Sequence, residues 1–219
     1  MAERPVSTQA TSGAGTIFEY RVAAIMLGRL LRSAHVPVGT AQPLARIGLQ
    51  RRNVGYPFDD IVAHTSPREA SFVAPTIQFQ VKVSLPIATK DKDAAFVKVM
   101  AAALNACRMN RAEVRAGAML LGLAVGEDPG GVLPDLAFLA EKARGHVGPE
   151  SFEEQIHPEA VSRKRRNLYM NVSAAVATAA TTDEPVLVLS MVHEVLAALH
   201  IWHASAGHEA ATDELNWTL

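Results

Sequence analysis

The sequence predicts an α/β fold, with a core of helices and strands to about residue 128 and a helical C-terminal extension after it. Two observations predict the core: apolar and polar residues alternate within segments between residues 44 and 85, and apolar residues recur at helical spacing on both sides of them. A third observation predicts the extension, because strand-like segments become rare from about residue 131 onward. A chain of 219 residues can form one good-sized domain, or one domain with an appendage.

The N-terminal part is predicted to be a flexible segment followed by a helix. Residues 1–14 are small and polar, and we expect them to be flexible. Over residues 16–32 apolar side chains recur at helical spacing, and two prolines end the pattern in the following stretch. The apolar positions that carry this prediction are Ile17, Tyr20, Ala24, Leu27 and Leu31.

Three strand-like segments follow. Residues 44–50 and 58–64 are separated by the sequence RRNVGYP, which is typical of a turn. Residues 71–85 form the best strand region, because four apolar residues alternate there with four polar ones. A polar face on a strand that is expected to be buried is the first indication of a functional site. The alternating residues are Ile77, Phe79, Val81 and Val83 against Gln78, Gln80, Lys82 and Ser84.

The rest of the chain is predicted to be mainly helical. Residues 91–107 indicate a helix with Asp91 near its N-cap, and residues 116–125 a further buried strand. The three later segments with a helical pattern are residues 133–144, 159–180 and 185–204. The sequence ends in DELNWTL, without a polar tail, and we expect a domain cut from a longer polypeptide, with a natural end docked on the body as the alternative.

Composition favours a cytoplasmic protein. The formal charge is −1, so no global basic field attracts nucleic acid and any DNA contact must come from local patches. The single cysteine, Cys107, excludes an internal disulfide and is most simply a buried apolar residue. The first residues do not have the pattern of a secretion signal, and the apolar runs are too short or too interrupted to predict a membrane span.

Acidic, amide and basic side chains on neighbouring strands predict a metal-dependent site. Gln80 and Lys82 are two residues apart and therefore share one face of their strand, whereas only one of Asp59 and Asp60 can point into the same site. Glu19 in the first helix is a further candidate carboxylate. Hard oxygen ligands hold Mg²⁺, and a cation beside the attacking water or the scissile phosphate completes a nuclease site.

These residues carry a resemblance to a known family. An acid on one strand followed by [Asp/Glu/Gln]-x-Lys on the next is the pattern of the PD-(D/E)xK nuclease superfamily, and Gln80-Val81-Lys82 resembles its Mrr-like branch. The segments GTIFEYRVAAIMLGRLL, GYPFDDIV, QFQVKVSL and KDKDAAFVKVM together resemble the double-stranded-DNA nuclease effector domain of bacterial antiphage systems, found in CBASS effectors and at the N-terminus of Avs-type STAND NTPases. The resemblance covers residues 13–100.

The resemblance implies a role for each matching residue. Glu19 matches the helix acid, and Asp59 or Asp60 matches the strand acid that binds the metal. Gln80 matches the second metal ligand, and Lys82 the lysine that orients or polarises the nucleophilic water. The implied cofactor is Mg²⁺ or Mn²⁺.

The family also implies an architecture and partners. The implied fold is a restriction-endonuclease-like core over residues 15–128, a mixed central sheet flanked by helices, with residues 129–219 as a helical extension that leads to a further C-terminal NTPase or sensor region. The implied activity is hydrolysis of double-stranded DNA with little sequence specificity, after activation by homo-oligomerisation and without a membrane partner.

Two departures from the family pattern leave alternatives open. Val83 stands where many relatives carry a polar or basic residue, and a neutral Gln80 holds Mg²⁺ more weakly than glutamate would. The chain can therefore also be a catalytically degenerate nuclease fold that acts as an assembly or DNA-binding module. A conventional restriction enzyme with sequence specificity ranks last, because no recognition module is evident.

Two further clusters are weaker candidates. The basic run Arg163, Lys164, Arg165 and Arg166 predicts a DNA-binding patch, with the solvated face of a helix or loop as the alternative. His200 and His203 have the i, i+3 spacing of a shared metal site, near His193 and His208. No acid or cysteine at matching spacing completes such a site, so we expect surface or packed histidines.

Overall fold

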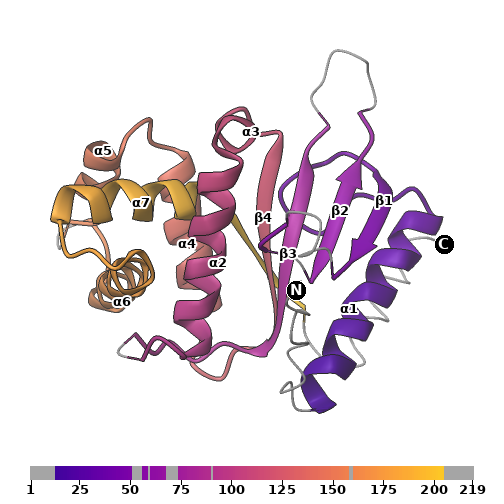
Figure 1. The fold of residues 1–219 in the computed structure, drawn as a ribbon, viewed down its shortest axis with the longest axis horizontal. Coiled ribbons are helices and arrows are strands. Elements are labelled where there is room, and N and C mark those ends of the chain that lie inside the picture. Colours follow the sequence, from indigo (N-terminus) through magenta and orange to yellow (C-terminus); the bar gives the residue numbers. More distant parts are fainter. Residues whose placement is uncertain are drawn as a thin grey trace, which may run out of the picture.

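The protein has a five-stranded mixed sheet flanked by helices (Figure 1). The computed structural model describes residues 13–50, 56–58, 60–67, 74–89, 91–157 and 160–204. The strand order is β1-β2-β3-β4-β5, in which β1–β2 and β2–β3 pair antiparallel and β3–β4 and β4–β5 pair parallel. This confirms the predicted α/β class. The strands are β1 Leu44–Leu49, β2 Ile61–Thr65, β3 Thr76–Ser84, β4 Met119–Glu127 and β5 Leu199–His203.

Helices cover both faces of the sheet. Figure 1 shows α1 on one side and α2, α4, α6 and α7 on the other. The two faces have separate apolar clusters, one between α1 and the sheet and a larger one among α2, α4, α6, α7 and the sheet. The helices are α1 Gly13–Leu31, α2 Ala95–Met109, α3 Arg111–Arg115, α4 Leu133–Arg144, α5 Pro149–Glu154, α6 Arg163–Ala180 and α7 Pro185–Ala198.

Helix α1 is confirmed, but it packs on a different stripe from the one that predicted it. Its buried residues are Phe18, Val22, Ala23 and Met26. All five positions that carried the prediction are exposed instead. Two apolar stripes lie on this helix, offset by one residue or about 100°, and periodicity alone does not choose between them.

The N-terminal boundary also differs from the prediction. Residues 13 and 14, predicted to be flexible with the rest of residues 1–14, form the first turn of α1. Residues 1–12, the predicted turn at 51–55 and the C-terminal residues 205–219 lie outside the described part of the chain.

Strand β3 has the predicted alternation. Ile77, Phe79 and Val81 pack against α1, so the alternating Gln80 and Lys82 point to the other face. This arrangement confirms that Gln80 and Lys82 share one face of the strand.

Asp91 lies three residues before the N-cap of α2 and does not cap this helix. The N-cap of α2 is Ala94, and no side chain caps this helix. Asp91 instead closes the turn before the helix, because its Oδ1 accepts a hydrogen bond from Asp93 N at 2.8 Å and its carbonyl oxygen accepts one from Ala94 N at 3.0 Å.

The segment 185–204 is not helical to its end. Helix α7 ends at Ala198, Leu199 has extended backbone angles, and residues 199–203 form β5 beside β4. Ile201 and Trp202 favour strands, and pairing with the open edge of β4 outweighs the helical periodicity of the preceding residues. The predicted helical extension therefore adds a strand to the sheet.

No single helix in the described part of the chain is long and apolar enough to cross a bilayer. Helices α6 and α7 meet the length and composition criterion only as a pair, bent by 106° at the break between them.

Candidate active site

The structure brings Asp60, Gln80 and Lys82 together. One carboxylate oxygen of Asp60, Oδ2, accepts a hydrogen bond from Gln80 Nε2 at 2.6 Å. The same oxygen lies 3.8 Å from Lys82 Nζ. Three of the predicted site residues, from segments twenty residues apart in the sequence, therefore meet at one point of the sheet.

Asp60 reaches this point because strand pairing ends next to it. Ile61 is the first residue of β2 and pairs with Phe79 of β3. One residue earlier, Asp60 Oδ2 accepts the backbone N–H of Val81 at 2.7 Å, in the position where the next backbone carbonyl of the ladder would lie. The carboxylate thus ends the ladder between β2 and β3, and it is fixed by the main chain as well as by side chains.

Neighbouring groups hold the segment before β2 in place. Gln78 Oε1 accepts a hydrogen bond from Phe58 N at 3.2 Å, and Phe58 is fully buried in the larger apolar cluster. On the opposite edge of β2, the carbonyl oxygen of Asp60 accepts a hydrogen bond from Gln50 N at 3.1 Å. The carboxylate is therefore positioned by rigid elements, which is a requirement for a precise site.

The site lies at the boundary between core and solvent. Gln80 is buried, whereas the side chains of Asp60 and Lys82 keep 18% and 28% of their surface exposed. A phosphate group approaching from solvent can reach the ammonium group, while the amide remains inside the protein. Low solvent access strengthens electrostatic contacts at such a place.

The donor set fits a weakly held divalent cation. Asp60 Oδ1 makes no hydrogen bond to a described residue, and a half-turn of the Gln80 amide would present Oε1 in place of Nε2. One carboxylate and one amide, completed by water and substrate phosphate, form a ligand set that Mg²⁺ accepts. Within the described ranges no three His, Cys, Asp or Glu side chains are grouped closely enough to hold a metal. Asp59 lies outside the described residues.

The structure places Glu19 on the other side of the sheet. It belongs to α1, which packs against the face of β3 that carries Phe79 and Val81. Gln80 and Lys82 point to the opposite face. The role of Glu19 in the site stays a prediction.

The basic run lies in the first turn of α6, and half of it is engaged within the protein. Lys164 Nζ and Arg165 Nε lie 3.1 Å and 2.9 Å from the two carboxylate oxygens of Asp135. Burial raises the pKa of Asp135, but the hydrogen bonds and charges of Arg165 and Lys164 outweigh this effect and hold the pKa below its usual value. Arg163 is exposed and Arg166 is half-buried. The predicted DNA contact stays a prediction, and these two residues are not paired with Asp135.

The i, i+3 spacing of His200 and His203 does not form a metal site. Both residues lie on β5 rather than on a helix, and residues three apart in a strand point to opposite faces. His193 lies on α7, and His208 is outside the described part of the chain. The expectation of packed or surface histidines is consistent with this arrangement.

One contact of the site could not be inferred from the sequence. The N–H of Val81 is a main-chain group, and its role depends on β2 ending at Ile61 rather than on any residue type. Gln78 belonged to the predicted polar face, but nothing in the sequence predicts that its side chain accepts a hydrogen bond from Phe58 N.

Comparison with known proteins identifies no relative of this chain. No family model, no curated protein and no solved structure matches the chain. A functional assignment therefore depends on the arrangement of Asp60, Gln80 and Lys82 and on the chemistry that these groups can perform.

Proposed function

We propose that this chain is a metal-dependent endonuclease that hydrolyses double-stranded DNA with little sequence specificity. The observation that carries the proposal is the convergence of a carboxylate, an amide and an ammonium group at Asp60 Oδ2. The three residues occupy the positions of a strand acid followed by Gln-x-Lys on the next strand, the pattern that resembles PD-(D/E)xK nucleases. The mixed sheet flanked by helices supports a restriction-endonuclease-like core.

Each residue has a distinct task in this proposal. Asp60 and Gln80 would hold Mg²⁺ or Mn²⁺, and the bound ion would neutralise the scissile phosphate and lower the pKa of a bound water. Lys82 carries a positive charge within 3.8 Å of the carboxylate and is partly exposed, so it can stabilise negative charge that develops on the phosphate. The hydrogen bond from the main-chain N–H of Val81 keeps the carboxylate in place while substrate binds and leaves.

The proposal includes control by assembly. The formal charge of −1 provides no general attraction for DNA, and two of the four basic residues at the start of α6 are paired with Asp135. A single copy would therefore bind DNA weakly. Homo-oligomerisation, driven by an NTPase or sensor region elsewhere in the full-length protein, would align several modest contacts and raise avidity.

A plasmid cleavage assay tests the proposed activity. Wild-type protein is incubated with supercoiled plasmid and Mg²⁺ or Mn²⁺, at high concentration and after clustering through a fused oligomerisation module. We expect a smear of products that Asp60→Asn abolishes. The matched control is Asp93→Asn, because Asp93 is a highly exposed aspartate in a surface ion pair. This variant should cleave the plasmid like wild type. Cleavage by Asp60→Asn at the wild-type rate would contradict the proposal.

A second candidate is a degenerate nuclease fold that acts as an assembly or DNA-binding module. One observation favours it: Gln80 donates its N–H to Asp60, so the two side chains satisfy each other without a metal. Thermal unfolding with and without Mn²⁺ separates the candidates. A metal-induced rise in Tm that Asp60→Asn removes supports the nuclease, whereas no rise together with no cleavage supports the module.

A further inference from the structure

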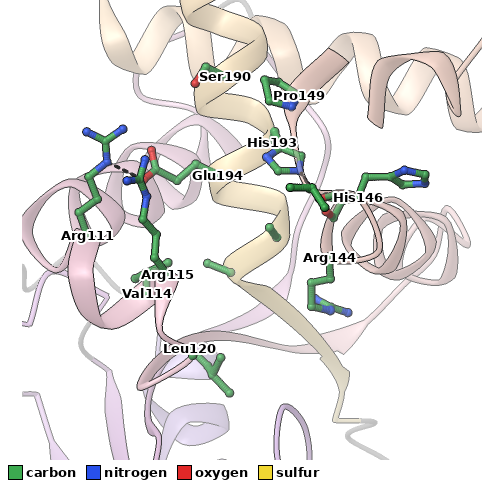
Figure 2. Close-up of a pocket in the computed structure, with 15 residues that line it drawn as sticks. Arg111, Val114, Arg115, Leu120, Arg144, His146, Pro149, Ser190, His193 and Glu194 are labelled. Atoms are coloured by element: carbon green, nitrogen blue, oxygen red, sulfur yellow. Dashed lines mark hydrogen bonds and ion pairs between the residues drawn. The ribbon is translucent and has the colours of Figure 1, made fainter. Parts of the chain in front are cut away.

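A pocket of about 570 Å³ lies at the opposite end of the sheet from Asp60 (Figure 2). One face of α7 forms its floor, and α3, the end of α4 and the start of α5 form its walls. Small residues create the hollow. Gly117 lies where α3 leads to β4, Ala143 is near the end of α4, and Ala197 and Ala198 end α7.

The pocket is separate from the candidate active site. Leu120 of β4 lines the pocket, whereas Leu123 of the same strand pairs with Gln80. Three residues of extended strand correspond to about 10 Å. A molecule in the pocket therefore does not touch Asp60 or Lys82, and the pocket needs an explanation of its own.

Two arginines of α3 bring unused donors to the pocket. Arg111 approaches Glu194 only through Nε, at 3.5 Å, and its two terminal nitrogens make no hydrogen bond to a described residue. Arg115, one turn further along α3, has no hydrogen bond or ion pair with any residue in the described part of the chain. Figure 2 shows the ion pair between Arg111 and Glu194, with Arg115 on the same wall of the pocket. Guanidinium groups that are free in this way are suited to paired hydrogen bonds with an anion.

Glu194 is the complementary feature of the same wall. Its side chain is only 20% exposed, and Oε1 is a buried oxygen that accepts no hydrogen bond from the described part of the chain. The contact with Arg111 Nε at 3.5 Å is an ion pair without hydrogen-bond geometry. A buried carboxylate oxygen without a donor is unfavourable, and a rotation of the Glu194 carboxylate toward the pocket that it lines would let a ligand N–H or O–H remove the deficit.

The opposite wall is held firmly and can act as a preformed surface. His193 Nε2 lies 3.1 Å from the carbonyl oxygens of both Ala143 and His146. Because carbonyls only accept, Nε2 carries the proton and ties the floor of the pocket to the end of α4. Arg144 Nη1 donates to Leu199 O at 2.6 Å and connects the same wall to β5.

We propose that this pocket binds a small phosphomonoester that also carries an amino or hydroxyl group. The lining contains three arginines, Arg111, Arg115 and Arg144, and one carboxylate, Glu194, so it carries a net positive charge. A phosphomonoester carries about −1.5 to −2 charges at neutral pH and three acceptor oxygens, which matches several guanidinium groups better than a carboxylate does. The amino or hydroxyl group donates to the Glu194 carboxylate after it has turned toward the pocket.

Isothermal titration with three probes tests the proposal on the full chain in a phosphate-free buffer. The probes are O-phosphoethanolamine, which has both features, inorganic phosphate, which has only the anion, and ethanolamine, which has only the donor. We expect saturable binding of O-phosphoethanolamine at least about tenfold tighter than that of inorganic phosphate, and no measurable binding of ethanolamine. Absence of saturable binding by both phosphate probes would overturn the proposal.

Two variants separate the two halves of the site. Arg115→Gln should weaken both phosphate probes at least about tenfold, since it removes the cation but leaves the fold. Glu194→Gln should bring O-phosphoethanolamine to within about twofold of inorganic phosphate. The matched control is Arg21→Gln, because Arg21 is an exposed arginine of α1 far from the pocket. This variant should bind all three probes like wild type. Unchanged binding in Arg115→Gln, or an unchanged preference in Glu194→Gln, would contradict the assignment.

Discussion

Asp60 and Glu194 are two carboxylates with almost the same exposure and very different surroundings. Their side chains are 18% and 20% exposed. Asp60 Oδ2 accepts hydrogen bonds from Gln80 and from the backbone of Val81 at 2.6 Å and 2.7 Å. Glu194 Oε1 is buried and accepts no hydrogen bond from a described residue.

The difference shows that burial does not define what a polar group does in this protein. Asp60 ends the ladder between β2 and β3 and is part of the fold whether or not it also holds a metal. Glu194 contributes no hydrogen bond from its buried oxygen, so the fold does not depend on it in the same way. Buried polar groups are nearly always satisfied, and an exception needs an explanation such as strain, a bound water or ion, or a functional role.

The largest expected effect on stability is that of Asp60→Ala. The substitution leaves the N–H groups of Gln80 and Val81 without an acceptor at the edge of the core. We expect the free energy of unfolding to fall by about 3 kcal/mol, which corresponds to a Tm lower by roughly 6–12 °C. Thermal and urea unfolding measure both values. Asp93→Ala, at a highly exposed aspartate, should change stability by less than about 0.5 kcal/mol, and an equal loss in both variants would contradict the structural role of Asp60.

An intermediate effect is expected from His200, which resembles Glu194 in having a buried atom, Nε2, without a hydrogen bond. Burial and, to a lesser extent, the charge of Arg144 lower the pKa of His200 from 6.5 to about 4. Between these pH values the unfolded chain binds a proton that the folded chain does not, so this contribution to stability is present above pH 6.5 and is lost as the pH falls toward 4.

Unfolding measurements at pH 7 and pH 5 test the effect of His200. We expect the wild type to lose roughly 1–2 kcal/mol more than His200→Gln over this interval, because the variant does not titrate there. The comparison cancels the contributions of the other histidines. Equal pH dependence in both proteins would show that His200 has the same pKa in the folded protein as in the unfolded chain, which would contradict the effect of burial.

The smallest effect is expected for Glu194→Gln. The substitution removes a charge whose buried oxygen has no hydrogen bond and whose partner, Arg111, is largely exposed. We expect the free energy of unfolding to change by less than about 0.5 kcal/mol. A loss similar to that of Asp60→Ala would mean that Glu194 supports the fold, and the contrast between the two carboxylates would not hold.

The part of the candidate site that follows from strand geometry could be predicted from the sequence. Alternation placed Gln80 and Lys82 on one face of β3, and the acids before β2 were expected at the same place. The choice of Asp60 depends on where β2 ends, which is a property of the pairing with Phe79 and not of the residues themselves. The stripe of α1 that packs on the sheet is not the one whose spacing predicted the helix, because two apolar stripes compete on that helix.

The pocket could not be predicted, because its residues meet only through tertiary packing. Arg111 and Arg115 come from α3, and Glu194 lies about eighty positions further along the chain in α7. No motif or regular spacing connects them. Strand β5 was missed for a similar reason, since residues 199–203 are strand only because the edge of β4 is available to them.

The measurement that tests the central claim most directly is plasmid cleavage by Lys82→Ala beside Lys98→Ala. Lys98 forms an exposed ion pair with Asp93, so its substitution removes a lysine of the same charge away from the site. With Mn²⁺ and clustered protein, the proposed nuclease predicts that Lys82→Ala cleaves at least about 100-fold more slowly than wild type and that Lys98→Ala cleaves normally. Equal cleavage rates for the two variants would contradict a catalytic site at Asp60, Gln80 and Lys82.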